Sequence, residues 1–308
     1  PSPCPCLPLD QRTTQPPAAP RYPPHPMYER RYGLIRTLAP LHVGASAGEE
    51  AGNLNLIFRD PFTQTGIIPG SSIRGRFRAE MRQENHEKGG DQSETIHWYG
   101  SEAGVAEISE ARVKFEYASL VWLPVFCPAQ PVVWVSCPRL LRRYAAITGL
   151  AGDSDLPKAD TCSQGLKGRA GEAGITLFFN LGFMEVKPVP GLERWIPSAL
   201  KNEIPSDRLV VVEDAAIGLI HDMALYRQSR VKLEDRMKKV DKGAFFNVEA
   251  LPEGSVLIFP LALKPDAAKD WSPFHTDAKR DLYFGGLESV GFGRCEVTLI
   301  NPTNQEVK

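Results

Sequence analysis

The sequence carries almost no net charge: 36 Lys and Arg balance 37 Asp and Glu, which leaves −1 at pH 7. A protein whose whole surface binds polyanions is usually strongly basic, so this balance argues against that class. An average can hide a local basic stripe, and the positions of the basic residues therefore matter. No stretch approaches the roughly 20 apolar residues of a membrane span. No basic segment followed by an apolar one indicates a secretory signal. We expect a cytoplasmic protein.

Recognisable metal and nucleophile motifs are also missing. The six cysteines form no C-x-x-C pair, and no histidine cluster lies near them. Free thiols are therefore expected in place of a zinc site. Neither G-x-S-x-G nor H-E-x-x-H occurs, and the six histidines are isolated. Only His42, in a glycine-rich segment, stands where a base could act, although such a histidine is more often a structural hydrogen-bonding partner.

The segment 1–26 contains ten prolines and no apolar periodicity, which predicts a disordered tail. Residues 27–308 then carry the patterns of one domain with large insertions. Strands are predicted at Tyr28 to Leu38 and near 54–61, and a helix at Ile73 to Arg82. The polar stretch 84–103 predicts a mobile insertion, and the Gly-, Asp- and Lys-rich stretch 151–174 predicts a loop.

The remaining segments complete an α+β order. Two apolar runs over 113–137, separated by Pro128 and Pro131, predict a β-hairpin, and Pro138 predicts the start of a helix. Strands and short helices follow. This order lacks the regular βα alternation of a doubly wound parallel sheet, and no internal repeat is visible.

The stretch TGIIPGSSIRGRFRAEMRQ (65–83) is the first candidate site. Ser71 or Ser72 is expected to cap a helix, and Gly70 to let the backbone approach a ligand. The free N–H groups of the first turn would then form an anion site. Basic side chains recur at i+4 along one ridge of this helix, Arg74, Arg78 and Arg82, with Arg76 nearby. Apolar side chains form the adjacent ridge, Ile73, Phe77 and Met81. An ordinary amphipathic helix with a solvated arginine face explains the same pattern.

Two further segments could contact a phosphate backbone. Gly285, Gly286, Gly291 and Gly293 precede Arg294, and such glycine density suits close passage of a sugar-phosphate chain, or simply a flexible turn. Residues 227–243 hold seven basic side chains against three acids, a local +4. The basic residues are Arg227, Arg230, Lys232, Arg236, Lys238, Lys239 and Lys242. A charge run is commonly a solvated face, yet this one projects between a helix and a strand.

Taken together, these segments resemble the RAMP superfamily of CRISPR proteins, and most closely the repeated backbone subunit of type III-B (Cmr) effector complexes. The matching pieces run in family order from about Tyr28 to Val297. They are TLAPLHVGA, TGIIPGSSIRGRFR, LVWLPVFCPAQPVVWVSCPRLLRR, DKGAFFNVEALP and GGLESVGFGR. The resemblance implies a ferredoxin-like (RRM-like) palm, a protruding thumb at 227–243, and copies stacked along one guide RNA.

The resemblance also implies partners and sites. Expected partners are guide RNA, target RNA, further copies of the chain, and other effector subunits, including the large signalling subunit and the small subunit. By the match, residues 70–78 and 291–294 hold the guide, and the H-x-G segment, His42 to Gly44, contacts RNA. The type III-A equivalent has the same task. A stand-alone ribonuclease that processes precursor RNA is the alternative of a different class, with His42 as its only candidate base.

One position departs from the family pattern. In the family, the loop after H-x-G carries an aspartate that promotes attack of a 2′-hydroxyl on the adjacent phosphate, with a divalent metal such as Mg²⁺ possible. Here Asn55 stands closest to that place, with the alignment off by one residue. An amide cannot act as a general base. Asp60 matches an acidic position that looks structural, and Glu249 matches a position near the cut site. No metal ligand is firmly assigned.

Overall fold

The computed structural model describes residues 28–44, 54–101, 109–128, 130–150, 155–180, 182–233, 240–265, 271–275 and 277–301. The predicted tail 1–26 lies outside these residues. Four α-helices are present in the described part: α1 (Gly70–Glu87), α2 (Ser93–Tyr99), α3 (Pro138–Thr148) and α4 (Ile217–Ala224). Three short 3-10 helices accompany them: η2 (Leu192–Trp195), η3 (Ser198–Leu200) and η4 (Glu288–Val290).

The strands of the larger sheet follow the order β15-β16-β1-β14-β5-β6-β11-β7-β10-β9-β8, with β3 beside β5 and β4 beside β14. Their bounds are β1 (Glu29–Thr37), β3 (Ile67–Ile68), β4 (Val113–Phe115), β5 (Ala118–Cys127), β6 (Gln130–Ser136), β7 (Thr161–Ser163), β8 (Arg169–Ala170), β9 (Ile175–Phe179), β10 (Gly182–Val189), β11 (Leu209–Val211), β14 (Val256–Leu263), β15 (Lys279–Tyr283) and β16 (Arg294–Ile300). A smaller sheet joins β12 (Tyr226–Leu233), β13 (Val240–Ala250) and β2 (Leu54–Asn55). The predicted α+β class is confirmed.

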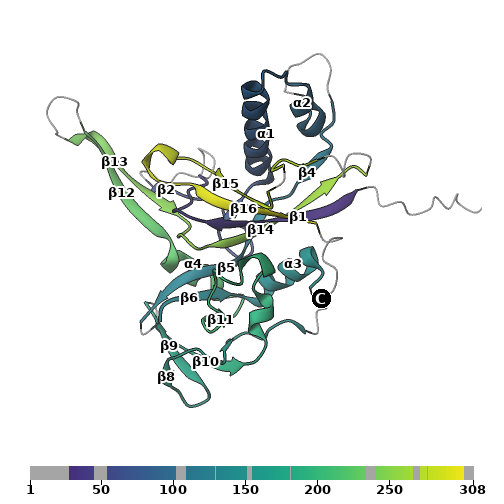
Figure 1. Ribbon diagram of the computed structural model, residues 1–308. Coiled ribbons are helices and arrows are strands. Elements are labelled where there is room, and N and C mark those ends of the chain that lie inside the picture. Colours follow the sequence, from purple (N-terminus) through teal and green to yellow (C-terminus); the bar gives the residue numbers. More distant parts are fainter. Residues whose placement is uncertain are drawn as a thin grey trace, which may run out of the picture.

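Alternation along the central strands gives the sheet two buried faces. Ile35 of β1 and Phe259 of β14 pack in one core with Phe77 of α1. Their neighbours Leu34 and Ile258 pack in a second core, which includes residues of α3. Figure 1 accordingly shows α1 and α2 above the sheet and α3 below it. Full burial of one such large side chain contributes about 1.5–3 kcal/mol, so both faces stabilise the fold.

The arginine-rich helix begins earlier than predicted, and the predicted serine cap is wrong. Its N-cap is Pro69, whose carbonyl accepts the N–H groups of Ser72 and Ile73, and no side chain caps it. A Cβ on Gly70 would lie 2.5 Å from the carbonyl oxygen of Phe115. Gly70 therefore serves close packing of the helix start on β4, which sets where the helix begins.

Two polar segments are more ordered than predicted. Within 84–103, α2 buries Thr95, Trp98 and Tyr99, which recur at helical spacing, so the expected mobile insertion is wrong there. Within 151–174, β7 pairs with β10 and β11 and β8 pairs with β9, so the expected loop is only partly present.

The local predictions in the middle of the chain are confirmed. β5 and β6 form the predicted antiparallel hairpin, and Pro138 occupies the first turn of α3. Four cysteines, Cys127, Cys137, Cys162 and Cys295, are buried free thiols, as expected.

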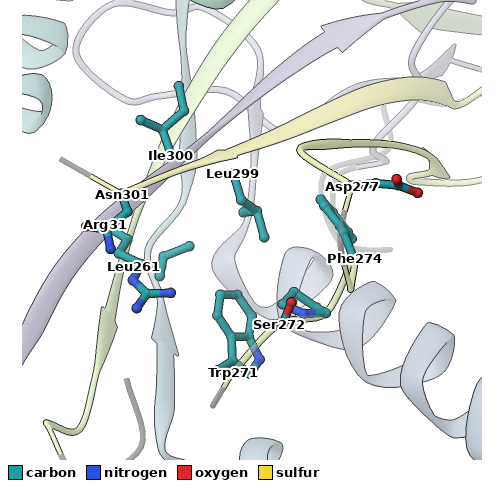
Figure 2. Close-up of a pocket in the computed structure, with 10 residues that line it drawn as sticks. Arg31, Leu261, Trp271, Ser272, Phe274, Asp277, Leu299, Ile300 and Asn301 are labelled. Carbon is teal, nitrogen blue, oxygen red and sulfur yellow. The ribbon is translucent and has the colours of Figure 1, made fainter. Parts of the chain in front are cut away.

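A small pocket of about 130 Å³ lies between the strands β1, β14 and β16 and the residues 271–274. Figure 2 shows the side chains that line it. Trp271 and Phe274, which line it, are only 3% and 5% exposed. Their rings lie 6.1 and 5.5 Å from that of Phe77, between centroids. Ligand pockets usually measure about 300–1,000 Å³, so this space is a gap beside the aromatic core.

Candidate nucleic-acid interface

The hairpin formed by β12 and β13 extends away from the palm sheet (Figure 1). It covers most of the segment 227–243, which was predicted to project as a thumb. Arg236, Lys238 and Lys239 lie outside the described residues. Lys232 and Lys242 lie in β12 and β13, but their side chains are outside the described part. Arg227 and Arg230 lie in β12, and Arg227 is close to the hairpin base.

The base of this hairpin gathers the three candidate catalytic residues. β2 runs parallel to β13 with Asn55 opposite Val248, the residue before Glu249. His42 lies next to Leu41, which pairs with Leu251 just beyond β13. The ring Nδ1 of His42 is 2.6 Å from the carbonyl oxygen of Glu249. Residues about 200 positions apart in sequence therefore meet at one place.

The Glu249 carboxylate is the centre of a chain of charges. Its side chain is 3% exposed, and Oε2 accepts a hydrogen bond of 2.9 Å from Nη2 of Arg59. Oε1 lies 3.2 Å from Nη2 of Arg227. Arg59 also pairs with Asp222 of α4. A buried carboxylate is costly unless it is paired, and two guanidinium groups satisfy this one.

The network fixes the charge states of its members. Partial burial would lower the pKa of Arg59, but its hydrogen bonds to Asp222 and Glu249 outweigh burial and raise it. The neighbouring His221 ring and the Arg59 guanidinium lower the pKa of Asp222 to about 2. His221 is itself fully buried, and burial lowers the pKa of its ring. Its Nε2 accepts the N–H of Gly66 at 2.9 Å, which suits the neutral ring.

This geometry separates the roles of the residues around Glu249. A carboxylate that is buried and held by two arginines is poorly placed to remove a proton from a substrate. It does orient Arg227, whose side chain is 53% exposed. Among the four charged side chains of this network, that of Arg227 is the most exposed. Asn55 is half-buried on β2, which lies on the other side of β13 from β12 and Arg227.

His42 is placed for packing more than for catalysis. The side chain is 8% exposed. Because a carbonyl oxygen can only accept, Nδ1 must donate to Glu249 O, which leaves the lone pair on Nε2. A Cβ on Gly44 would lie 3.2 Å from that Nε2, so Gly44 makes room for the ring. The His42 hydrogen bond ties the segment 41–44 to β13, and the backbone of Gly44 forms a bridge with Ile57.

The glycine-rich loop packs on the same segment. Gly285 has φ +78°, and a Cβ there would lie 2.0 Å from His42 O. Gly293 has φ +87°, and a Cβ there would lie 2.5 Å from Phe284 O. These two glycines allow backbone segments to approach each other, while their predicted contact with a sugar-phosphate chain stays a prediction. A Cβ on Gly291 would meet no atom within 4 Å, so this position is open to a ligand.

The arginines predicted to bind phosphate already have protein partners. Arg294 donates to Asp281 through Nε at 2.9 Å and Nη2 at 2.6 Å, with both side chains about half exposed. Exposed pairs exchange partners at little cost. On α1, Arg74 donates to Tyr99 O and so ties α1 to α2. Arg76 pairs with Glu80. The predicted basic ridge on α1 is therefore partly structural.

The described residues do not fit a protein-held magnesium ion. They contain no group of three His, Cys, Asp or Glu side chains that could hold a metal. Asp222 and Glu249 face arginines, whose positive charge disfavours a cation. No chemical step is therefore assigned to a metal here. Among the described residues, no helix is long and apolar enough to cross a membrane.

Arg59, His221 and Asp222 were not predicted from the sequence as members of this network. Asp60, by contrast, is structural as expected, since Oδ1 accepts the N–H groups of Phe62 and Thr63 at 2.9 and 2.8 Å. A signal for the missed residues was present: charged or ionisable groups interrupt the apolar runs LIFRDP and GLIHDMAL. Such groups in a buried element usually have partners, but sequence alone does not identify them.

Comparisons with known proteins agree with this architecture. The family model of the RAMP superfamily matches residues 34–296. Type III-B Cmr-beta in its apo state contains a chain that is 20% identical, with a TM-score of 0.68 over 89% of this chain and 99% of that one. Cmr-beta bound to cognate target RNA contains a chain that is 19% identical, with a TM-score of 0.69 over 89% of this chain and 98% of that one.

Oligomeric Cmr4 from Pyrococcus furiosus is 16% identical, with a TM-score of 0.63 over 89% of this chain and 99% of that one. At such identities the structural likeness shows a shared fold. The search of curated proteins found no match. Since the family model spans most of the sequence, the chain belongs to the RAMP superfamily.

Proposed function

We propose that the chain is a guide-RNA-binding backbone subunit of a type III-B CRISPR effector complex. The observation that carries the proposal is the fold match over 89% of this chain and 98% of a chain from Cmr-beta bound to cognate target RNA. The oligomeric form of Cmr4 supports assembly of several copies.

The hairpin base supplies the chemistry for such a role. Arg227 presents a guanidinium that Glu249 holds in place, and guanidinium groups bind phosphates irrespective of base sequence. Gly291 leaves an open approach to the loop that packs on His42. In this arrangement the protein contacts the RNA backbone, and base pairing between guide and target supplies the specificity. The remaining hairpin would displace a nucleotide where two copies meet.

Cleavage of the paired target is a separate part of the proposal. The 2′-oxygen attacks the adjacent phosphorus, a new O–P bond forms, the bond to the 5′-oxygen breaks, and the 2′-hydroxyl proton must leave. A carboxylate at position 55 can accept this proton, whereas the amide of Asn55 can only hydrogen-bond. Loss of a general base typically slows a reaction by about 10²–10⁴. The chain should therefore hold guide and target but cut the target slowly.

The partners follow from the same proposal: guide RNA, target RNA, further copies, and the large signalling and small subunits, all in the cytoplasm. The type III-A equivalent would use the same features. A stand-alone ribonuclease is less well supported, because its candidate base, His42, is buried and donates to Glu249 O. Such an enzyme would process precursor RNA as a monomer.

Salt-dependent RNA binding tests the proposal. Arg227→Ala should weaken binding of a guide RNA irrespective of its sequence and lower the salt slope by about one. Arg194→Ala is the matched control, since Arg194 is also exposed but lies beside Trp195, away from the hairpin. If the wild-type chain does not bind guide RNA, or if both variants bind as it does, the proposal fails.

A further inference from the structure

A second cleft, of about 620 Å³, lies on the α3 side of the palm. Its size is within the range of about 300–1,000 Å³ that is usual for small-molecule sites. It is lined by Asp60, Phe62, Thr63, Tyr117, Ser119, Arg139, Leu140, Arg142, Arg143, Ala146 and Asp214. Three arginines of one helix and two aromatic rings therefore line the same cleft.

The arginines and rings of this cleft are paired face to face. The guanidinium of Arg139 lies 4.7 Å from the ring centroid of Phe62, and that of Arg143 lies 4.1 Å from the centroid of Tyr117. Arg143 also donates to the hydroxyl of Ser119 at 3.0 Å, which fixes its position. Stacking on a ring holds a guanidinium plane while its N–H groups remain free to meet an anion at the edge.

Phe62 is the least expected residue here. The residue is 74% exposed, so its ring contributes little to core packing. A polar residue on this tight turn would serve the fold equally well, which makes an exposed phenylalanine unexpected. Two sets of contacts hold the turn. Asp60 accepts the N–H groups of Phe62 and Thr63. Gly218 of α4 also packs closely against it, since a Cβ on Gly218 would lie 3.1 Å from the Gln64 Cβ. The ring is thus presented to solvent on a rigid support.

The two acids of the cleft have other partners. Asp60 Oδ1 holds the turn, and Asp214 Oδ1 accepts the backbone N–H of Arg139 at 2.9 Å. With three arginines and two aspartates among the lining residues, the cleft has a formal charge of +1. An anion with a flat ring fits such a cleft, because charge and stacking surface are provided together.

We propose that this cleft binds one unpaired nucleotide of an RNA strand. Arg139 and Arg142 would contact its phosphate, and its base would stack on Phe62. The proposal rests on the proposed function, because the RNA must already be held by the hairpin base. Arg59 of that base directly precedes the turn that presents Phe62, so the turn 60–65 connects the two sites.

An acidic segment of another protein is the competing ligand. It would use the arginines equally well, but it gains nothing from an exposed ring, whereas every nucleobase has a face that can stack. The observed combination of ring and guanidinium therefore favours RNA.

Ultraviolet crosslinking of the full chain to a labelled single-stranded RNA tests the assignment directly. We expect a crosslink in the tryptic peptide 60–74, which contains Phe62. Phe62→Ala should remove this crosslink and weaken binding at least about fivefold, since loss of one base stack costs about 1–3 kcal/mol. Arg139→Ala with Arg142→Ala should weaken it as well. Arg143 is left intact because it supports Ser119 and Tyr117.

Phe183→Ala is the matched control, because Phe183 is also 74% exposed but lies at the start of β10. It should bind RNA like the wild type. If the wild type binds RNA while the crosslinks map elsewhere and Phe62→Ala binds normally, the cleft proposal is overturned and the proposed function stands. If the arginine variant instead loses self-association without RNA, the cleft is a protein contact. A chain that binds no RNA at all refutes the proposed function itself.

Discussion

Replacement of each of the two arginines that pair with Glu249 should affect a different property: loss of Arg59 should lower stability, and loss of Arg227 should weaken RNA binding. Arg59→Met leaves a carboxylate that is 3% exposed with Arg227 as its remaining partner. Breaking a buried ion pair costs about 3–5 kcal/mol, and the retained partner places this case near 3 kcal/mol. Asp222 adds little, because its side chain is 45% exposed and water can replace the lost hydrogen bond.

Arg227→Met should cost much less stability. Its side chain is 53% exposed, and Arg59 still neutralises Glu249, so about 0–1 kcal/mol is expected. Methionine keeps much of the apolar stem in both variants, which isolates the loss of charge. The RNA affinity should change in the opposite order, with Arg227→Met binding guide RNA more weakly than Arg59→Met.

Urea unfolding followed by tryptophan fluorescence measures the first effect, and fluorescence anisotropy with a labelled guide RNA measures the second. For Arg59→Met the midpoint should fall while the slope stays unchanged. Equal losses of stability in the two variants would refute the assignment of Arg59 to the fold and Arg227 to the RNA.

Three further predictions concern the same region. Burial lowers the pKa of His221, so its contribution to stability is present above about pH 6.5 and is lost as the pH falls. His221→Gln should therefore flatten the decline of the unfolding free energy below that pH, and an unchanged decline would contradict this. Gly285→Ala should lower the unfolding midpoint, because φ is +78° and its Cβ would lie 2.0 Å from His42 O. Gly286→Ala should leave the midpoint unchanged, because a Cβ there meets open space. Similar midpoints in the two variants would show that the loop adapts. Asn55→Asp should produce target cuts at regular spacing and Asn55→Ala should not, as seen by denaturing electrophoresis; brisk cutting by the Asn55 form would place the catalytic group elsewhere.

How much the sequence foretold depended on whether a signal was local. The hairpin 113–137 and the helix at Pro138 were predicted because long apolar runs and proline act within a few residues. The start of α1 was misplaced because the contact of Gly70 with Phe115 O, far along the chain, decides it. The helix α2 was not predicted because polar residues outnumber the few buried side chains in the stretch 84–103.

The candidate site shows the same division. Asn55 and Glu249 were selected through the family resemblance and His42 from its glycine-rich segment, and the structure brings the segments that carry them together at the hairpin base. The pairs of Arg59 with Asp222 and Glu249 span 163 and 190 positions, and no local pattern encodes them. Only the parallel pairing of β2 with β13 and the docking of α4 bring these residues into contact.

The mass of the particle formed with guide RNA tests the central claim most directly. Native mass spectrometry of the full chain, mixed with guide RNAs of increasing length, should show a ladder in which the number of bound copies rises in regular steps with RNA length. A backbone subunit requires this result, because each copy covers a fixed stretch of guide. A single copy on every RNA, whatever its length, would contradict the account.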